Sequence, residues 1–270
     1  MKVTKLNINK SDNEKKIKEK NTVYYKSRFN FLSQHNGIRP NKMHLFVAPT
    51  HVGKSTLINA IVHDLIERNE DVKVLLYLTE ETVSDFESAI SRFVNNYDRI
   101  NMQLDVLVED RSRSDDGIKD SIETAVFHNG YDLMFIDNLT TSKLYMDRST
   151  ETQASVSNWL KSLVKDVAIF IIAHTNGNNY NSQILDETHI RGSKSITNMT
   201  EFLYVMQPVR INNSLFQFIR IIKHRDQSPE DKFFRLNYDK KAKTISHDSA
   251  CSFDDFKSNF KLRNSLWMNI

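Results

Sequence analysis

The feature that most constrains the fold is a regular alternation of apolar runs and helical periods that starts at residue 43. Short apolar runs indicate buried strands, and apolar residues that recur every three or four positions indicate amphipathic helices. Strands that alternate with helices form a mainly parallel central sheet flanked by helices, because each helix returns the chain to the same edge. The predicted strands are 43–48, 72–78, 104–108, 133–136 and 167–173, and the predicted helices are 56–67, 84–95, 118–128 and 152–164.

The pattern changes after about residue 200, where apolar runs follow one another without helical periods between them. Consecutive strands indicate antiparallel pairing, and we expect these C-terminal strands to extend one edge of the parallel sheet. They are predicted at 202–206, 215–222, 233–237 and 244–246. We therefore predict one α/β domain over residues 26–250, preceded by a charged N-terminal arm over 1–25 and followed by a short helical tail over 251–270.

Composition excludes some kinds of site without identifying a partner. The 37 Lys and Arg residues against 34 Asp and Glu residues give a formal charge of +3, too small to indicate a nucleic-acid partner by charge alone. Cys251 is the only cysteine, so an internal disulfide and a multi-cysteine metal site are excluded. No run of about 18 uncharged apolar residues occurs, and the N-terminus does not resemble a signal peptide. We expect a soluble cytoplasmic protein with no membrane partner.

A phosphate-binding loop is predicted between the first strand and the first helix. Gly53-Lys54-Ser55 follows an apolar strand and opens an amphipathic helix, which is the context that a P-loop requires. Backbone N–H groups would face the phosphates of ATP, Lys54 would neutralise the β and γ oxygens, and Ser55 would bind Mg²⁺. Ala48 stands where the first glycine is usual, and a chance Gly-Lys-Ser at a turn is the alternative. The predicted nucleotide-binding residues are Ala48, Pro49, Thr50, His51, Val52, Gly53, Lys54, Ser55 and Thr56.

Polar residues at the ends of three other strands would complete such a site, since ligands gather at the carboxyl ends of parallel strands. Asp137 ends its strand whereas Asp132 precedes it, so Asp137 is the candidate that holds Mg²⁺. Glu80 and Glu81 follow the second strand, which we expect beside the phosphate-loop strand, and one of them would polarise the attacking water. A charge at a helix N-terminus is the alternative for Glu81. His174 ends the fifth strand and is a candidate γ-phosphate sensor, with a structural role as the alternative.

Taken in order, these residues resemble a known family. Residues 29–247 resemble the helicase domain of DnaB-type replicative helicases and of phage primase-helicases, a RecA-like branch of the P-loop ATPases. The stretch 37–49 is similar to the family's lead-in to its phosphate loop. Residues 74–81 are similar to the strand that ends in the catalytic glutamate, and this alignment selects Glu80 over Glu81.

Two further segments resemble parts of that family that sense or contact the γ-phosphate. Residues 170–176 resemble the motif whose Gln or His couples the γ-phosphate state to the DNA-binding loops, which implies this role for His174. Residues 221–225 resemble the element that reaches the γ-phosphate of a neighbouring subunit, which makes Arg225 the arginine finger and Lys223 its companion. Without the resemblance, an alternating, solvent-facing strand edge would be the preferred interpretation of these two residues.

The resemblance also implies a DNA-binding pore. The segments 141–149 and 176–194 would line it, because loops can track a phosphate backbone through charge and amide groups. Solvated surface loops are the alternative. Tyr238 matches an aromatic residue that stacks on the nucleotide base, but Thr197 stands where the family has the arginine on the other face of that base. The candidate nucleic-acid-binding residues are Lys143, Arg148, Arg191 and Lys194.

The resulting hypothesis is an ATP-dependent, ring-forming DNA helicase that moves along single-stranded DNA in replication, in a bacterial cell or a phage-infected host. We expect a homo-oligomer, a hexameric ring, with replication proteins bound through the N- and C-terminal tails. The chain shows no primase or collar domain, so ring assembly would depend on its N-terminal arm or on another protein. The alternatives are a RecA-like recombination ATPase and a helicase-loading or regulatory ATPase.

Overall fold

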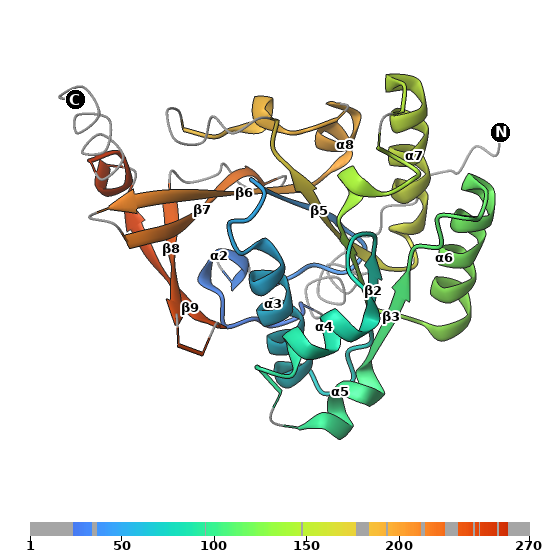
Figure 1. The fold of residues 1–270 in the computed structure, drawn as a ribbon, viewed down its shortest axis with the longest axis horizontal. Coiled ribbons are helices and arrows are strands. Elements are labelled where there is room, and N and C mark those ends of the chain that lie inside the picture. Colours follow the sequence, from blue (N-terminus) through green and yellow to red (C-terminus); the bar gives the residue numbers. More distant parts are fainter. Residues whose placement is uncertain are drawn as a thin grey trace, which may run out of the picture.

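The structure, a computed structural model, describes residues 24–33, 37–94, 96–146, 148–176, 184–192, 194–211, 214–224, 232–239, 241–242, 244–252 and 254–258. Within these residues, nine strands form one sheet, and helices cover both of its faces (Figure 1). The predicted α/β class with a mainly parallel central sheet is confirmed.

The parallel half of the sheet contains all five strands predicted before residue 200. Every residue of the phosphate-loop strand is buried, because helices lie on both faces of the sheet, and such a strand reads as a continuous apolar run. The strands are β1 (Met43–Ala48), β2 (Val74–Leu78), β3 (Leu104–Val108), β4 (Leu133–Asp137) and β5 (Ala168–His174). Together with the next strand along the chain, β6 (Phe202–Ile211), they lie in the order β3-β2-β4-β5-β1-β6.

The position of β2 differs from the prediction. β1 pairs with β5 on one side and with β6 on the other, so β4 and β5 separate β2 from β1. The expectation that the strand before Glu80 lies beside the phosphate-loop strand is therefore wrong. Both neighbours of β1 come from later in the chain, and local sequence predicts which residues form strands but not the order in which distant strands pair.

Antiparallel strands continue the sheet beyond β6, as predicted. Gln207 and Gln217 lie inside these strands and are buried, so the strands extend past the apolar runs that marked them in the sequence. β6 pairs parallel with β1 and antiparallel with β7, and β8 and β9 follow in antiparallel order. The strands are β6 (Phe202–Ile211), β7 (Ser214–His224), β8 (Lys232–Asp239) and β9 (Thr244–Ser252).

The helices bury apolar stripes on the two faces of the sheet. On one face lie α2 (Asn30–Ser33), α3 (Lys54–Arg68), α4 (Val83–Ile90) and α5 (Tyr97–Gln103). On the other face lie α6 (Asp115–Asn129), α7 (Thr150–Leu163) and α8 (Lys194–Met199). Two 3₁₀ turns, η1 (Leu139–Thr141) and η3 (Glu187–His189), follow β4 and β5 along the chain.

The helix predicted over 84–95 is shorter in the structure. α4 ends at Ile90, and α5 begins after Asn96, whose side chain accepts a hydrogen bond from the Arg99 N–H at 3.1 Å. An asparagine cap of this kind starts a new helix because it satisfies an N–H of the first turn. The short helices α2, α5 and α8 are not predicted from the sequence, since too few turns are present to show a period.

Tyr25 and Asp132 lie at the amino-terminal edge of the sheet, opposite the phosphate loop. The Tyr25 main chain pairs with Ile38, and its hydroxyl donates to Asp132 at 2.9 Å. Asp132 also accepts a hydrogen bond from the Lys73 N–H at 2.9 Å. These contacts give Asp132 a structural role and leave Asp137 as the strand-end acid. The predicted tails lie mostly outside the described residues.

Among the helices of the described residues, none has the length and apolar composition needed to cross a bilayer.

Because the ring of His44 is buried, we expect the free energy of unfolding to depend on pH. His44 lies in β1 and stacks on Phe202 with ring centroids 4.4 Å apart. Burial lowers the pKa of His44 from 6.5 to about 3. Between about pH 6.5 and about pH 3 the unfolded chain binds a proton at His44 and the folded chain does not. The free energy of unfolding should therefore fall as the pH drops, with His44 contributing at most about 1.4 kcal/mol per pH unit.

Urea unfolding at several pH values between neutral and about pH 5 measures this effect. The His44→Phe variant keeps an aromatic ring in the stack but has no titratable group, so it should lose less stability than the wild type. Equal losses in the two proteins would contradict the assignment.

Candidate active site

The segment between β1 and α3 turns sharply before the helix begins. Gly53 has φ +87°, in the left-handed region that favours glycine, and a Cβ atom there would lie 2.9 Å from the side-chain nitrogen of Gln217. The Gln217 amide donates a hydrogen bond to the Val52 carbonyl and so holds the turn against β7. Gln217 is not predicted from the sequence, because β7 is far away along the chain.

The N-terminus of α3 opens toward this turn. Gly53 is the N-cap residue, so no side chain at the cap position satisfies the N–H groups of the first turn. Unsatisfied N–H groups and the helix dipole favour an anion at this position. The predicted strand–loop–helix arrangement of the phosphate loop is therefore present in the fold.

Lys54 is the buried charge at the centre of the site. The residue is 6% exposed, and its Nζ lies 3.2 Å from His174 Nδ1 and 3.5 Å from Nε2. Burial lowers the pKa of Lys54, and the carboxylates of Asp137, Glu80 and Glu81 act in the opposite direction. Residues from α3, β4, β5 and the turn after β2 thus meet at the carboxyl edge of the parallel strands.

Asp137 ends β4 and is buried. Burial raises its pKa to about 6; the charges of Glu81 and Glu80 add to this rise, and Lys54 together with a hydrogen bond from Ser55 opposes it. The predicted magnesium residues, Ser55 and Asp137, are therefore neighbours. Mg²⁺ is usually held by one or two protein oxygens together with waters and phosphate oxygens, and this pair fits such a site. In the described part of the chain no three His, Cys, Asp or Glu side chains group as a metal site, so the metal would depend on those other ligands.

The two glutamates after β2 face different partners. Glu80 Oε1 accepts a hydrogen bond from Asn138 Nδ2 at 2.9 Å and lies 3.3 Å from His174 Nε2. The hydrogen bond with His174 is the largest cause that lowers the pKa of Glu80 to about 2. Burial raises the pKa of Glu81, against a hydrogen bond from Ser55. Glu81 precedes the first residue of α4, so it does not supply a charge to the first turn of that helix.

Asn138 and Thr140 also belong to the site, although neither is predicted from the sequence. Asn138 is fully buried, and its Nδ2 lies 2.8 Å from His174 Nε2. The Thr140 hydroxyl donates to Asn138 Oδ1 at 2.6 Å and accepts from the His174 main-chain N–H at 3.2 Å. Asn138 could have been found from its position, because it is a polar residue directly after Asp137, where the strand ends.

The end of β5 connects this site to the two predicted nucleic-acid segments. The His174 carbonyl accepts a hydrogen bond from the Arg191 N–H at 2.9 Å, and Thr175 pairs with Ile190. The second segment thus lies against the end of β5, and Thr140, which contacts the His174 main chain, directly precedes the first segment. A cavity of about 200 Å³ lies between the two segments and is lined by Thr140, Tyr145, Met146, Gln153, Arg191 and Gly192.

Lys143 and Arg148, predicted to contact nucleic acid, have partners within the chain. Lys143 Nζ donates to the main-chain carbonyls of Arg111 and Arg113 at 3.0 and 2.6 Å. Arg148 Nη2 donates to both carboxylate oxygens of Asp115, at 2.9 Å each. These contacts hold the first segment against the start of α6.

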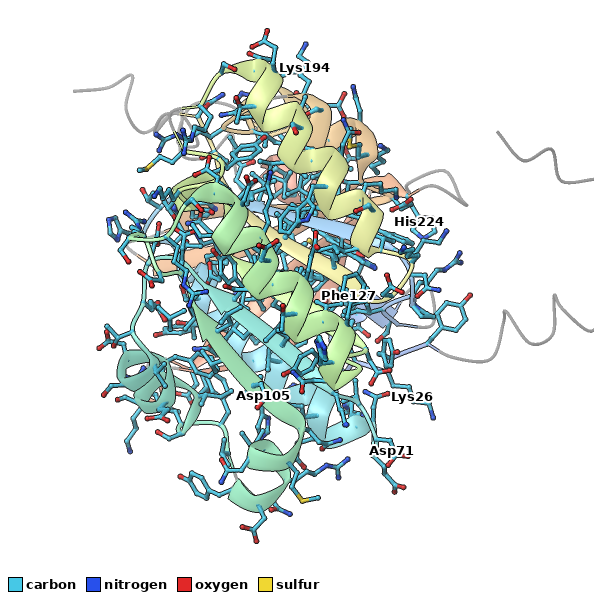
Figure 2. All side chains as sticks on the ribbon, turned by 90° about the vertical axis from the view of Figure 1, so that its right-hand side faces the viewer. Lys26, Asp71, Asp105, Phe127, Lys194 and His224 are labelled. Carbon is cyan, nitrogen blue, oxygen red and sulfur yellow. The ribbon has the colours of Figure 1, made fainter. Side chains whose placement is uncertain are left out.

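Three of the remaining predicted residues are exposed, and Lys223 is partly buried. Arg191 and Lys194 are exposed, and Lys194 projects at the margin of the molecule (Figure 2). Tyr238 lies on β8 and is 43% exposed. Lys223 Nζ donates to two main-chain carbonyls of α8, at 2.9 and 3.2 Å. Arg225 lies outside the described residues.

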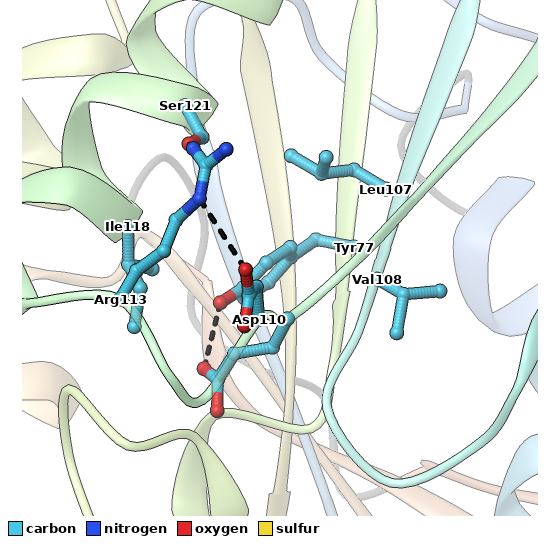
Figure 3. A pocket seen from close by; sticks show the side chains of 8 residues that line it. Tyr77, Leu107, Val108, Asp110, Arg113, Ile118 and Ser121 are labelled. Carbon is cyan, nitrogen blue, oxygen red and sulfur yellow. Dashed lines mark hydrogen bonds and ion pairs between the residues drawn. The ribbon is translucent and has the colours of Figure 1, made fainter.

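Glu109 anchors the start of the first predicted nucleic-acid segment. Its buried carboxylate accepts hydrogen bonds from the Tyr77 hydroxyl at 2.6 Å, the Ser142 hydroxyl at 2.5 Å and the Lys143 N–H at 2.9 Å. A second cavity, of about 140 Å³, opens beside this cluster between β2, β3 and α6 (Figure 3). The first segment is therefore fixed to the sheet at its start.

In comparisons with known proteins, no family model matches this chain and no curated protein matches it. The function is therefore argued from the geometry of the site.

Proposed function

We propose that the chain is a RecA-like P-loop ATPase that hydrolyses ATP with Mg²⁺. The observation that supports this proposal is the convergence of Lys54, Glu80, Asp137 and His174 from four elements at one edge of the sheet. Hydrolysis of ATP needs a cation on the phosphate oxygens, a support for the metal and a group that orients water, all in one place. These side chains supply all three.

Each residue has a defined part in this proposal. The N–H groups at the start of α3 bind the phosphates, and Lys54 moves from the His174 ring to the β and γ oxygens. Ser55 and Asp137 would hold Mg²⁺, which would neutralise charge on the phosphates. Glu80 is ionised at neutral pH because its pKa is about 2. A carboxylate with so low a pKa is a weak base, so Glu80 acts mainly by orienting and polarising the attacking water.

The strand order supports the RecA-like part of the proposal. β5 lies between the phosphate-loop strand β1 and the Asp137 strand β4. His174, at the end of β5, therefore stands between the phosphate-binding lysine and the metal-binding acid, which is where a γ-phosphate sensor has to be.

We further propose that ATP hydrolysis drives movement along single-stranded DNA in replication, as in a ring-forming helicase. His174 supports this step, because its main chain contacts Thr140, directly before the first predicted DNA segment, and Arg191 in the second. When ATP is hydrolysed, the group that the His174 ring contacts would change. The His174 main chain could pass the resulting movement on to both segments. Tyr238, exposed on β8, is the proposed base-stacking residue.

The exposed Arg191 and Lys194 are the proposed first contacts with the DNA backbone. Lys143 and Arg148 would have to leave their partners within the chain before binding a phosphate. In the same way, Lys223 would have to leave the carbonyls of α8 in order to reach a neighbouring subunit.

The two glutamates after β2 allow a direct test of hydrolysis. Glu80→Gln should lower kcat for ATP hydrolysis by about 100-fold or more and leave ATP affinity nearly unchanged, because the variant keeps the shape but loses the charge that polarises water. Glu87→Gln, at an exposed glutamate of α4, is the matched control and should retain full activity. Glu81→Gln should lower kcat less than Glu80→Gln does, because Glu81 reaches the site through its hydrogen bond with Ser55 and not through His174. A steady-state ATPase assay of the three variants makes the comparison. An active Glu80→Gln, or a larger loss in Glu81→Gln than in Glu80→Gln, would contradict the assignment.

The ring is tested through Arg225, proposed to reach the γ-phosphate of the neighbouring subunit. Arg225→Ala should abolish ATP hydrolysis and leave nucleotide binding largely intact, because a finger supplied from outside acts on the transition state. The mass of the wild type with ATP, Mg²⁺ and single-stranded DNA should be that of a closed homo-oligomer, and the protein should unwind a DNA fork.

A monomer with full activity would contradict the ring. Strand pairing by a filament without fork unwinding would favour a recombination ATPase. A closed oligomer without unwinding would favour a helicase-loading or regulatory ATPase.

A further inference from the structure

The side-chain amide of Asn138 has one orientation that its neighbours allow. The Thr141 N–H can only donate, so the Asn138 atom 3.1 Å from it is the oxygen Oδ1. The Glu80 carboxylate, ionised, can only accept, so the atom 2.9 Å from it is the nitrogen Nδ2. Both assignments agree, and the Thr140 hydroxyl donates to the same Oδ1. The Asn138 amide therefore presents its N–H₂ group to the site.

This amide nitrogen and the Lys54 ammonium both face the ring of His174. Asn138 Nδ2 lies 2.8 Å from Nε2, and Lys54 Nζ lies 3.2 Å from Nδ1 and 3.5 Å from Nε2. Both groups are donors only. A neutral imidazole has one acceptor nitrogen, because the other carries the hydrogen. The two donors therefore compete for a single lone pair, and only one can be satisfied by the ring.

We propose that Asn138 is a positioning residue that holds Nε2 of His174 as the acceptor, so that Nδ1 carries the hydrogen once Lys54 moves away. The two hydrogens of the Asn138 amide then go to His174 Nε2 and to Glu80 Oε1, which lie 3.3 Å apart. Because Nε2 carries no hydrogen in this tautomer, Asn138 replaces the ring as the donor to Glu80, and the ring donates to Glu80 only in the other tautomer. One amide thus fixes the sensor histidine and the water-orienting glutamate together.

In this tautomer the hydrogen of the His174 ring is on Nδ1, which makes Nδ1 a donor in the site. Nδ1 is the ring nitrogen of His174 nearer to Lys54 Nζ, at 3.2 Å against 3.5 Å for Nε2. In the proposed function, on which this consequence rests, the phosphates draw Lys54 away from the ring. The Nδ1–H group is then left to donate toward them. Without Asn138, Nε2 would carry the hydrogen and donate to Glu80, and the sensor would present an acceptor to an anion.

The test reads the tautomer without any nucleotide. In the Lys54→Met variant the competing donor is absent, and ¹⁵N-histidine NMR at about pH 8, where an ordinary histidine is neutral, should show the hydrogen of His174 on Nδ1. In the double variant Lys54→Met/Asn138→Leu it should move to Nε2. His174→Gln assigns the resonance. Lys54→Met/Asn129→Leu, altered at an exposed asparagine of α6, is the matched control and should keep the Nδ1 form.

An Nε2 hydrogen in Lys54→Met, or an Nδ1 hydrogen in the double variant, would overturn the proposal. If circular dichroism shows that Asn138→Leu does not fold, Asn138→Asp replaces it in the double variant. Its carboxylate accepts from the ring and should also give the Nε2 form, and an Nδ1 form there would equally overturn the proposal. Failure of the proposed function would be seen separately, as absence of ATP binding. A protein that binds no ATP can still show these tautomers.

Discussion

The buried ammonium of Lys54 is the constraint on which the carboxyl edge of the sheet depends. A charge removed from water is unfavourable by several kcal/mol unless opposite charges and hydrogen bonds compensate for it. Three carboxylates, on Asp137, Glu80 and Glu81, supply that compensation. Three negative groups around one positive group leave a surplus of negative charge, and the raised pKa of Asp137 reflects it together with burial. A divalent cation would remove this surplus, whereas a phosphate alone would increase it. In the proposed function the nucleotide therefore needs Mg²⁺ with it, because its phosphates alone would add to the negative charge of the site.

The topology of the sheet places these charges. Parallel strands bring their carboxyl ends to one edge, and the order β4-β5-β1 puts Asp137, His174 and the phosphate loop on three successive strands. β2 lies on the far side of β4, and Glu80 still reaches His174 because the turn after β2 folds back over the end of β4, where the Thr79 hydroxyl donates to the Asn138 carbonyl at 2.9 Å. The same edge continues through His174 and Thr175 into the segment that contains Arg191.

Strands and strand-end residues could be predicted because their signals are local. An apolar run followed by an acid or a histidine marks the end of a buried parallel strand, and Asp137 and His174 are found where this rule places them. Lys54 opens α3, as the Gly-Lys-Ser pattern after a strand predicts. The neighbours of β1 could not be predicted, because strand pairing depends on contacts between distant parts of the chain. Gln217 and Asn138 were missed for related reasons. Gln217 reaches the phosphate loop from a strand far along the sequence, and Asn138 resembles an ordinary turn residue until its buried contacts are known.

The central claim is that Lys54 and its neighbours form a nucleotide site, and equilibrium binding tests it most directly. Isothermal titration of the protein with ATP and Mg²⁺ should give one site per chain, with much weaker binding when either Mg²⁺ or the Lys54 ammonium, in Lys54→Met, is absent. The folded state of the variant is checked by circular dichroism. Absence of binding by the wild type, or equal affinity in wild type and Lys54→Met, would contradict the claim.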